Sequence, residues 1–164
     1  MKKHRLDSRL DQFEQICRQR GLSLTVPRRA IFESMQDRKD HPTADQVYAD
    51  IKTKLPGISR TSVYRVLEML VDIGMLTKVC HPGSAARFDP QSIQHHHLVC
   101  MNCERIIDVR TPRLDDLPLP DVRTHGFRIH DYHICFRGTC SDCLKKQKTN
   151  TRPADQSAKD DAQS

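Results

Sequence analysis

Apolar residues in the first half of the chain recur at every third or fourth position, which predicts a run of amphipathic helices. Residues that start and stop helices mark the boundaries. Gly21 follows the first run, Thr25 precedes Pro27 at the start of the second, and Ser59 and Gly74 bracket the last. The predicted helices cover residues 6–20, 25–36, 43–55 and 59–73.

The last of these helices has two contrasting faces. One face is an apolar stripe, and the other carries hydroxyl, aromatic and guanidinium groups. This helix and the one before it, at residues 43–55, are short and joined by a turn, which is typical of a helix-turn-helix. The alternative is that the polar face is an ordinary solvated surface. The inward set is Val63, Val66, Leu67 and Leu70, and the outward set is Thr61, Tyr64, Arg65 and Glu68.

The hydrophobic period changes after Gly74. MLTKVC and AARFD alternate roughly between apolar and polar residues, and HPGS separates them, which predicts a β-hairpin with Pro and Gly in its turn. A hairpin directly after a recognition helix is a wing, so it favours DNA binding. Because residues 90–94 have the character of a hinge, we expect a winged helix-turn-helix domain at residues 1–90.

The second half is short and rich in strands, predicted at residues 97–100, 105–109 and 127–137, with a weak helix at 113–117. Such a unit builds little core, so it needs a metal, a partner subunit or both. We expect a small α/β dimerisation domain at residues 91–147 and an α+β fold class overall. Residues 148–164 contain no apolar residue larger than Ala apart from one Pro, which predicts a disordered tail.

Composition narrows the functional classes. The chain has 27 Lys and Arg against 21 Asp and Glu, and its formal charge of +6 permits nucleic-acid binding without establishing it. No apolar run approaches the roughly 20 residues that a membrane span needs, and the start lacks the apolar stretch of a secretory signal. We therefore expect a cytoplasmic protein without a membrane partner. Its 7 cysteines then stay reduced and favour metal binding.

Two CxxC pairs make a candidate metal clamp, Cys100 with Cys103 and Cys140 with Cys143. Two such turns complete a tetrahedral four-thiolate zinc site, which is structural because it leaves no open position. The linking segment is longer than in a zinc ribbon, so strands must bring the pairs together. Two unrelated reduced turns or redox pairs are the disfavoured alternative, because neither pair opens a helix in a βαβ pattern. The other cysteines are expected in the core (Cys17) or as strand residues or reactive thiols (Cys80, Cys135).

Three consecutive histidines suggest a second metal site. Two of them, at alternate positions of an extended segment, point to one side, and His96 points to the other. With a histidine from the loop before the third helix and two aspartates expected on neighbouring strands, they form a nitrogen and oxygen set suited to Fe(II), Mn(II) or Zn(II). A metal held this way would fix the angle between the two domains. The candidate ligands are His41, Asp89, His95, His97 and Asp108.

Five motifs together resemble the ferric uptake regulator (Fur) family: HPTADQVYADIK, SRTSVYRVLEMLVDIG, ARFDP, HHHLVCMNC and GTCSDC. The match runs from about Gly21 to Lys146, and the combination and order of the motifs are highly specific. The resemblance implies a homodimer whose winged helices bind duplex operator DNA, with a structural Zn(II) on the four cysteines. It also implies a regulatory Fe(II) or Mn(II), with Zn(II) also compatible, on the five residues above. The implied DNA-binding residues are Arg60, Thr61, Ser62, Tyr64 and Arg65.

Three residues depart from the family pattern. Ser23 stands where many relatives have a basic residue that enters the minor groove, and Glu104 replaces the usual Gly after the second clamp cysteine. Tyr132 replaces a His ligand of an extra metal site that iron-uptake members have. The neighbours that would rebuild this extra site are His96, Asp115, His130 and His133.

The aspartate at position 108 is similar to the peroxide-responsive branch (PerR), because iron-uptake members usually have Glu there. In that branch bound Fe(II) reacts with hydrogen peroxide and oxidises a histidine ligand, which releases the DNA; here the oxidisable ligands would be His41 and His95. We therefore expect a metal-dependent repressor that senses peroxide and is not an enzyme. The alternative is a Fur-like sensor of iron, zinc or manganese level. A metalloenzyme and a zinc-stapled interaction module are less favoured, because the chain offers a winged helix and no obvious general base.

Overall fold

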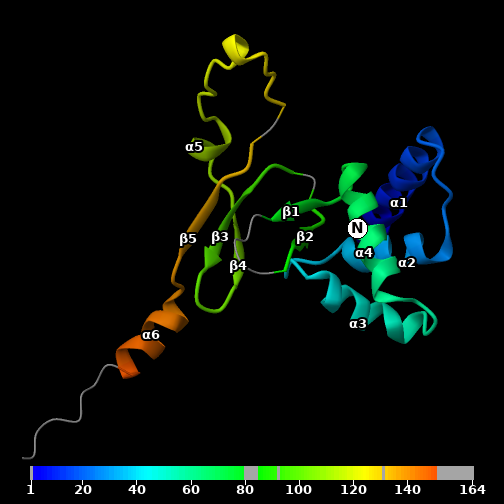
Figure 1. The fold of residues 1–164 in the computed structure, drawn as a ribbon, viewed down its shortest axis with the longest axis horizontal. Helices are drawn as coiled ribbons and strands as arrows, with labels where there is room; N and C mark the ends of the chain where they lie inside the picture. Colours follow the sequence, from blue (N-terminus) through cyan, green and yellow to red (C-terminus); the bar gives the residue numbers. More distant parts are fainter. Residues whose placement is uncertain (1, 80–84, 92, 131, 151–164) are drawn as a thin grey trace, which may run out of the picture.

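The computed structural model describes residues 2–79, 85–91, 93–130 and 132–150. Helices fill the N-terminal part and short strands the C-terminal part, which makes the α+β fold class that the sequence predicts (Figure 1). The elements are α1 (Lys2–Gln19), α2 (Val26–Met35), α3 (Ala44–Lys54), α4 (Arg60–Asp72), β1 (Thr77–Val79), β2 (Arg87–Asp89), β3 (His96–Cys100), β4 (Ile106–Val109), α5 (Pro112–Asp115), the 3₁₀ turn η1 (Arg123–His125), β5 (Cys135–Gly138) and α6 (Ser141–Asn150).

Local capping explains where the helices begin. Before α3, the Gln46 amide donates to Thr43 Oγ1 at 3.3 Å and the Thr43 amide donates to Gln46 Oε1 at 2.8 Å, which is a capping box. Before α4, Ser59 Oγ accepts from the Ser62 amide at 3.0 Å. Thr25 occupies the predicted N-cap of α2 but makes no side-chain cap bond there. The start of α2 therefore relies on Pro27, whose ring presets a helical φ.

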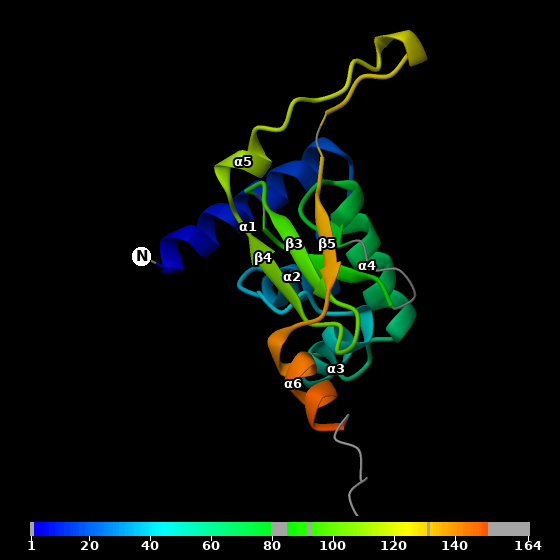
Figure 2. The same cartoon turned by 90° about the vertical axis from the view of Figure 1, so that its left-hand side faces the viewer.

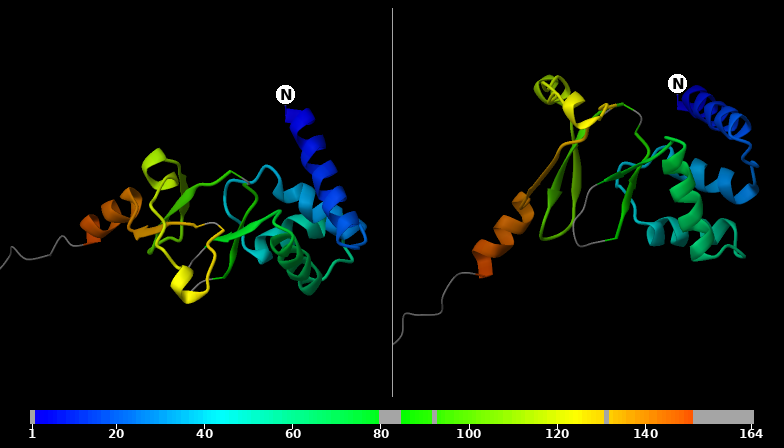
Figure 3. Two further views of the ribbon diagram at one scale, coloured as in Figure 1. Left: turned by 90° about the horizontal axis from the view of Figure 1, so that it is seen from above. Right: turned by 45° about the horizontal axis from the view of Figure 1, so that its top comes forward.

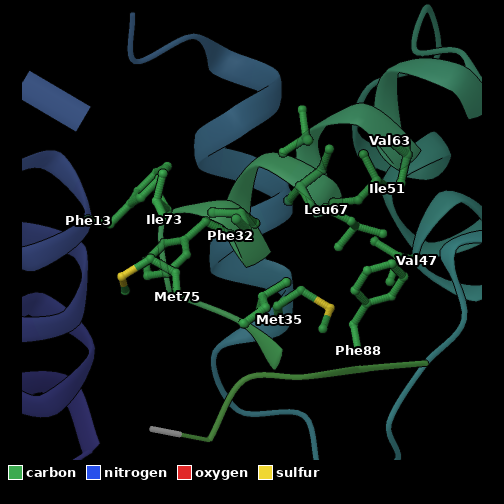
Figure 4. Close-up of a cluster of buried hydrophobic side chains, with 14 of the residues drawn as sticks. Phe13, Phe32, Met35, Val47, Ile51, Val63, Leu67, Ile73, Met75 and Phe88 are labelled. Carbon is green, nitrogen blue, oxygen red and sulfur yellow. The ribbon is translucent and has the colours of Figure 1, made fainter. Parts of the chain in front are cut away.

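The core lies among α1 to α4 and the wing (Figure 4). The rings of Phe13 and Phe32 stack with centroids 4.3 Å apart, which fastens α1 to α2. Phe88 of β2 points into the same core beside Met35 and Val47 and is fully buried. A wing strand is thus anchored in the helical core, and the residue that follows Phe88 is the candidate ligand Asp89.

The predicted hairpin is confirmed as the antiparallel pair β1 and β2, with Thr77 opposite Asp89 and Val79 opposite Arg87. Its predicted turn, HPGS, lies outside the described residues, and so does Cys80. The hairpin also holds the loop before α3, because Thr43 bridges Arg87 and the Phe88 amide donates to the Pro42 carbonyl at 3.0 Å. This contact sets the loop that carries His41 beside the end of β2.

The second sheet has the order β4-β3-β5, with β4 antiparallel and β5 parallel to the central β3 (Figure 2). Seen from above, this sheet stands between the helical lobe and α6 (Figure 3). From residue 91 onward, Val99 and Cys100 are the buried apolar side chains among the described residues. The second half therefore builds little core of its own, as its sequence predicts.

In the second half, one predicted strand is wrong and one predicted boundary shifts. The strand predicted at residues 127–137 is reduced to Cys135–Gly138, because the segment before it runs out into a long excursion with α5 and η1, where Phe127 is 72% exposed (Figure 1). Gly126 turns this excursion with a positive φ of 68°. The tail predicted from residue 148 begins too early, since α6 continues to Asn150. Lys and Gln favour an exposed helix without any core. Residues 151–164 lie outside the described part of the chain.

None of the helices within the described ranges combines the length and the apolar character needed to cross a membrane.

Candidate metal and DNA-binding sites

Five side chains from separate segments meet where the helical lobe joins the second sheet. His41 comes from the loop before α3, Asp89 ends β2, and His95 immediately precedes β3. His97 lies in β3 directly opposite Asp108 of β4. The predicted alternation is confirmed, because these histidines share one side of the sheet. Asp89 was expected on a strand next to the histidines, but it belongs to the wing sheet instead.

The donor atoms of this cluster point at one another. Asp89 Oδ2 lies 2.7, 3.5 and 3.9 Å from Nε2 of His95, His97 and His41. Asp108 Oδ1 lies 2.9, 3.8 and 3.9 Å from Nε2 of His41, His95 and His97. The Nε2 atoms of His95 and His97 are 3.0 Å apart. The three histidines and Asp89 are buried, with exposed fractions of 1 to 4%.

The bonding of these atoms fits a cation at the centre. His41 Nε2, Asp89 Oδ2 and Asp108 Oδ1 are buried and contact one another and the other histidines without a hydrogen bond of good geometry, which is costly for polar atoms unless a cation binds them. His95 Nδ1 faces the Ile93 carbonyl at 2.9 Å. A carbonyl only accepts, so Nδ1 donates this bond and Nε2 is the ring nitrogen that faces the cluster. Three imidazole nitrogens and two carboxylate oxygens suit Fe(II), Mn(II) or Zn(II).

The protonation states in this cluster favour metal binding. Burial lowers the pKa of His41 below its ordinary value, although the nearby Asp89 and Asp108 offset part of this effect. Burial acts to raise the pKa of Asp89, but its interactions with His97, the Gln91 amide and the other histidines outweigh burial and lower that pKa. At neutral pH His41 is therefore neutral and Asp89 ionised, as metal ligands must be.

The four clamp cysteines gather as the CxxC spacing predicts. Their sulfur atoms all lie within 4.8 Å of one another. The parallel pairing of β3 with β5 sets Cys100 opposite Gly138, which brings Cys140 alongside. Cys103 and Cys140 have sulfurs 3.7 Å apart. A tetrahedron with Zn–S bonds of about 2.3 Å has edges of about 3.8 Å, so the donor set and its spacing fit Zn(II).

Backbone amides prepare one of these thiols for a metal. The Cys140 amide donates to Cys100 Sγ at 3.3 Å, and this bond, with others from Cys103 and Asn102, lowers the pKa of Cys100 to about 6. Hydrogen bonds with Cys140 and Cys103 raise the pKa of Cys143 to about 12. Without a cation the clamp thus holds a first thiolate at Cys100 and resists forming another at Cys143.

The residues of the extra site do not assemble into a third cluster. His96 points away from the other histidines, with Nε2 3.2 Å from Asp115 Oδ1 and its ring stacked on Tyr132. The Tyr132 hydroxyl donates to the Leu114 carbonyl at 2.6 Å, so it fastens α5. Over residues 2–79, 85–91, 93–130 and 132–150, donor atoms within 4.8 Å of one another form two groups, the four clamp cysteines and a set of His41, Asp89, His95 and His97, and neither group includes His130 or His133. Of the other cysteines, Cys17 is buried in the core as predicted and Cys135 is partly exposed on β5.

The outer face of α4 is exposed, as the two-faced pattern predicts. Arg60 Nη1 donates to Asp45 Oδ1 at 2.8 Å, and its guanidinium lies over the Tyr48 ring at 5.2 Å. Ser62 is partly committed to the helix cap, since its hydroxyl lies 2.9 Å from that of Ser59. The predicted DNA-binding residues Arg60, Thr61, Ser62, Tyr64 and Arg65 are all exposed.

The Gly-to-Glu departure keeps the turn after the clamp. Glu104 adopts a positive φ of 59°, and its amide donates to the Cys100 carbonyl at 2.9 Å. Its carboxylate lies 3.2 Å from Arg87 Nη2, and Arg87 Nη1 donates to the His41 carbonyl at 3.1 Å. His41 has a positive φ as well, 48°. Arg87 thus links the turn after the clamp to the loop that carries His41. This link was not predicted from the sequence, where Arg87 appears only as part of the ARFDP motif.

Arg28 places a positive charge next to Ser23, which stands where many relatives have a basic residue. The Arg28 guanidinium donates to the Ser23 carbonyl, so its charge lies at the start of α2.

Comparisons with known proteins agree with this arrangement. Residues 19–137 match the model of the Ferric uptake regulator family. The chain is 31% identical over 127 residues to the peroxide operon regulator of Bacillus subtilis, which covers 77% of this chain and 88% of that protein. It is 29% identical over 141 residues to the peroxide-responsive repressor PerR of Staphylococcus epidermidis, covering 86% and 94%. The structure of the Helicobacter pylori ferric uptake regulator Fur superposes with a TM-score of 0.71 at 19% identity, over 85% of this chain and 93% of that one.

Proposed function

The chain belongs to the ferric uptake regulator family, and from this premise we propose that it is a metal-dependent DNA-binding transcriptional repressor that senses peroxide. The observation that carries the proposal is the His/Asp cluster, in which the buried His41 and Asp89 from the wing side face Asp108 and His95 at the second sheet, at 2.9 and 2.7 Å. The named peroxide-responsive relatives support the peroxide signal.

The cluster supports a direct route from metal to DNA affinity. His41 and Asp89 belong to the proposed DNA-binding domain, residues 1–90, whereas His95, His97 and Asp108 belong to the proposed dimerisation domain, residues 91–147. A metal bound to all five side chains fixes the winged helix relative to the second sheet, so metal binding and DNA binding stabilise the same arrangement. In this proposal α4 enters the DNA groove with Tyr64 and Arg65 on its exposed face.

The histidines supply the chemical sensor. A bound Fe(II) ion would supply the electron that reduces hydrogen peroxide and yields an oxidant at the site. His41 and His95 lie closest to the two carboxylates, at 2.9 and 2.7 Å, and oxygen added to either ring changes its donor atoms. The five-residue cage then loosens, the winged helix loses its fixed angle, and the repressor leaves its operator.

The clamp and an apolar sheet face support a zinc-containing homodimer. Zn(II) on the four cysteines ties the ends of β3 and β5 to α6 and replaces the missing core. Leu98, Ile107 and Phe136 are paired across the three strands and are 43%, 43% and 40% exposed. A second copy of the chain would cover this face. Because thiolate ligands and Fe(II) need a reducing compartment, we place the protein in the cytoplasm.

The second candidate function is sensing of iron, zinc or manganese level. The observation that favours it is the donor set itself, since three nitrogens and two oxygens also suit Mn(II) and Zn(II). Zn(II) has no redox chemistry, so a zinc-loaded cluster would report metal level alone.

Mass spectrometry after peroxide treatment separates these candidates. We expect the Fe(II)-loaded protein to gain oxygen on the peptides that carry His41 and His95, whereas the Mn(II)-loaded protein does not. The peptide that carries His125, an exposed residue of η1 outside the cluster, is the internal control. Unmodified His41 and His95 peptides in the Fe(II) form would rule out the peroxide signal and leave metal-level sensing.

A further inference from the structure

Gln91, in the linker between β2 and β3, contacts both carboxylates of the His/Asp cluster. Its backbone amide donates to Asp89 Oδ1 at 2.9 Å, and its side-chain Nε2 donates to Asp108 Oδ2. Its Oε1 accepts from Arg110 Nη2. An arginine only donates and an ionised carboxylate only accepts, so the Gln91 amide has one orientation that satisfies both neighbours.

These contacts divide the oxygens of each carboxylate between two roles. The outer oxygens, Asp89 Oδ1 and Asp108 Oδ2, are held by Gln91. The inner oxygens, Asp89 Oδ2 and Asp108 Oδ1, are buried without a hydrogen bond and face the histidines. Each aspartate is thereby set to offer a single oxygen to a cation. The two hydrogen bonds differ in origin, because the main-chain amide of Gln91 binds Asp89 and the side-chain amide of Gln91 binds Asp108.

We propose that Gln91 is a positioning residue that holds Asp108 as a one-oxygen ligand and thereby sets the preference of the cluster for Mn(II) and Fe(II) over Zn(II). The inference rests on the proposed function, in which a metal binds this cluster. With Asp108 in place the cluster offers five donors. Without Asp108 it offers three histidines and Asp89, a four-donor set that suits the tetrahedral preference of Zn(II).

The side chain of Gln91 can be removed without losing the bond to Asp89. Gln91→Ala keeps the main-chain amide and deletes only the bond to Asp108. Gln91→Glu keeps the length but replaces the amide donor with a like charge beside Asp108. Gln94→Ala is the matched control, because it removes the same side chain from an exposed position of the same linker.

Metal affinity of the full-length, structurally zinc-loaded protein is the readout, with free Mn(II) followed by its EPR signal and Zn(II) by a competing chelator. We expect Gln91→Ala to weaken Mn(II) binding about 10- to 100-fold, the usual effect of removing a residue that orients a ligand. We expect Gln91→Glu to weaken it at least as much. Zn(II) binding should fall by less, so the ratio of Mn(II) to Zn(II) affinity drops, which a general loss of folding would not produce.

The outcomes separate the two claims. A parent protein that takes up no metal beyond its structural zinc would overturn the proposed function itself. If the parent binds Mn(II) and Gln91→Ala binds it as tightly as Gln94→Ala does, Gln91 does not position Asp108. Equal losses of Mn(II) and Zn(II) affinity in Gln91→Ala would overturn the selectivity role.

Discussion

Glu104 offers a test of how the turn after the zinc clamp is held. It stands in the left-handed region with a φ of 59°, and its carboxylate pairs with Arg87 at 3.2 Å. Two substitutions separate these features. Glu104→Ala removes the ion pair and keeps a side chain in the left-handed region, whereas Glu104→Gly removes both the ion pair and the backbone strain.

The magnitudes predict an order of stability. The left-handed conformation costs a residue with a side chain roughly 1–2 kcal/mol. An ion pair whose Glu side chain is 45% exposed contributes about 0.2–1 kcal/mol. Glycine offsets part of this gain, because the greater freedom of the unfolded chain destabilises the fold by roughly 0.5–1 kcal/mol. Glu104→Ala should therefore destabilise by about 0.2–1 kcal/mol, and Glu104→Gly should be more stable than Glu104→Ala by about 0.5–1 kcal/mol.

Urea unfolding of the zinc-loaded variants measures this order. Protein concentration must be equal throughout, because the apparent stability of a dimer depends on it. Similar m-values are needed before the midpoints are compared. If Glu104→Ala is as stable as Glu104→Gly, the left-handed backbone at this position carries no strain and the reasoning fails.

The remaining predictions concern the core, the clamp and the sheet face. Phe88→Ala should destabilise the fold by about 3–5 kcal/mol in thermal or urea unfolding, because it empties a fully buried site. Its control, Val26→Ala at a 69% exposed position, should change the free energy of unfolding by no more than about 0.5 kcal/mol. Similar losses of stability in the two variants would contradict the core described above. In zinc-free protein, ultraviolet absorbance should show a thiolate forming near pH 6 that is absent in Cys100→Ser. Because the folded pKa of Cys100 lies below its ordinary value of 9.0, its stabilisation is complete above pH 9 and is lost as the pH falls through about 6; a first thiolate near pH 9 would contradict this. Leu98→Lys should shift sedimentation toward monomer, whereas Val26→Lys should not, and a Leu98→Lys dimer as stable as the parent would place the dimer interface elsewhere.

Features that depend on nearby residues could be predicted from the sequence. The starts of α3 and α4 follow from Thr43 and Ser59, which cap them within three residues. The clamp follows from CxxC spacing, and the opposite directions of His96 and His97 follow from strand alternation. Donor chemistry grouped His41 with candidate ligands more than 45 residues away, and the resemblance to a known family placed all five at one regulatory site, which no local pattern can do.

Features that depend on long-range geometry could not be predicted. Gln91 sits in a linker of ordinary composition, and its role becomes visible only when β4 brings Asp108 and Arg110 to it. The path from Glu104 through Arg87 to His41 likewise joins three separate segments. The strand predicted at residues 127–137 failed because apolar residues such as Phe127 stay exposed on the excursion. The start of the predicted tail was placed three residues too early, because α6 needs helix propensity and no apolar face.

The decisive measurement is DNA binding by the zinc-loaded protein, followed by fluorescence anisotropy first with Mn(II) or Fe(II) and then with peroxide. We expect either metal to promote binding to the operator and peroxide to abolish binding only for the Fe(II) form, with His41→Ala losing the response to metal. Binding that survives peroxide with both metals would contradict peroxide sensing and identify a sensor of metal level. Binding that ignores both metals would contradict the proposed function altogether.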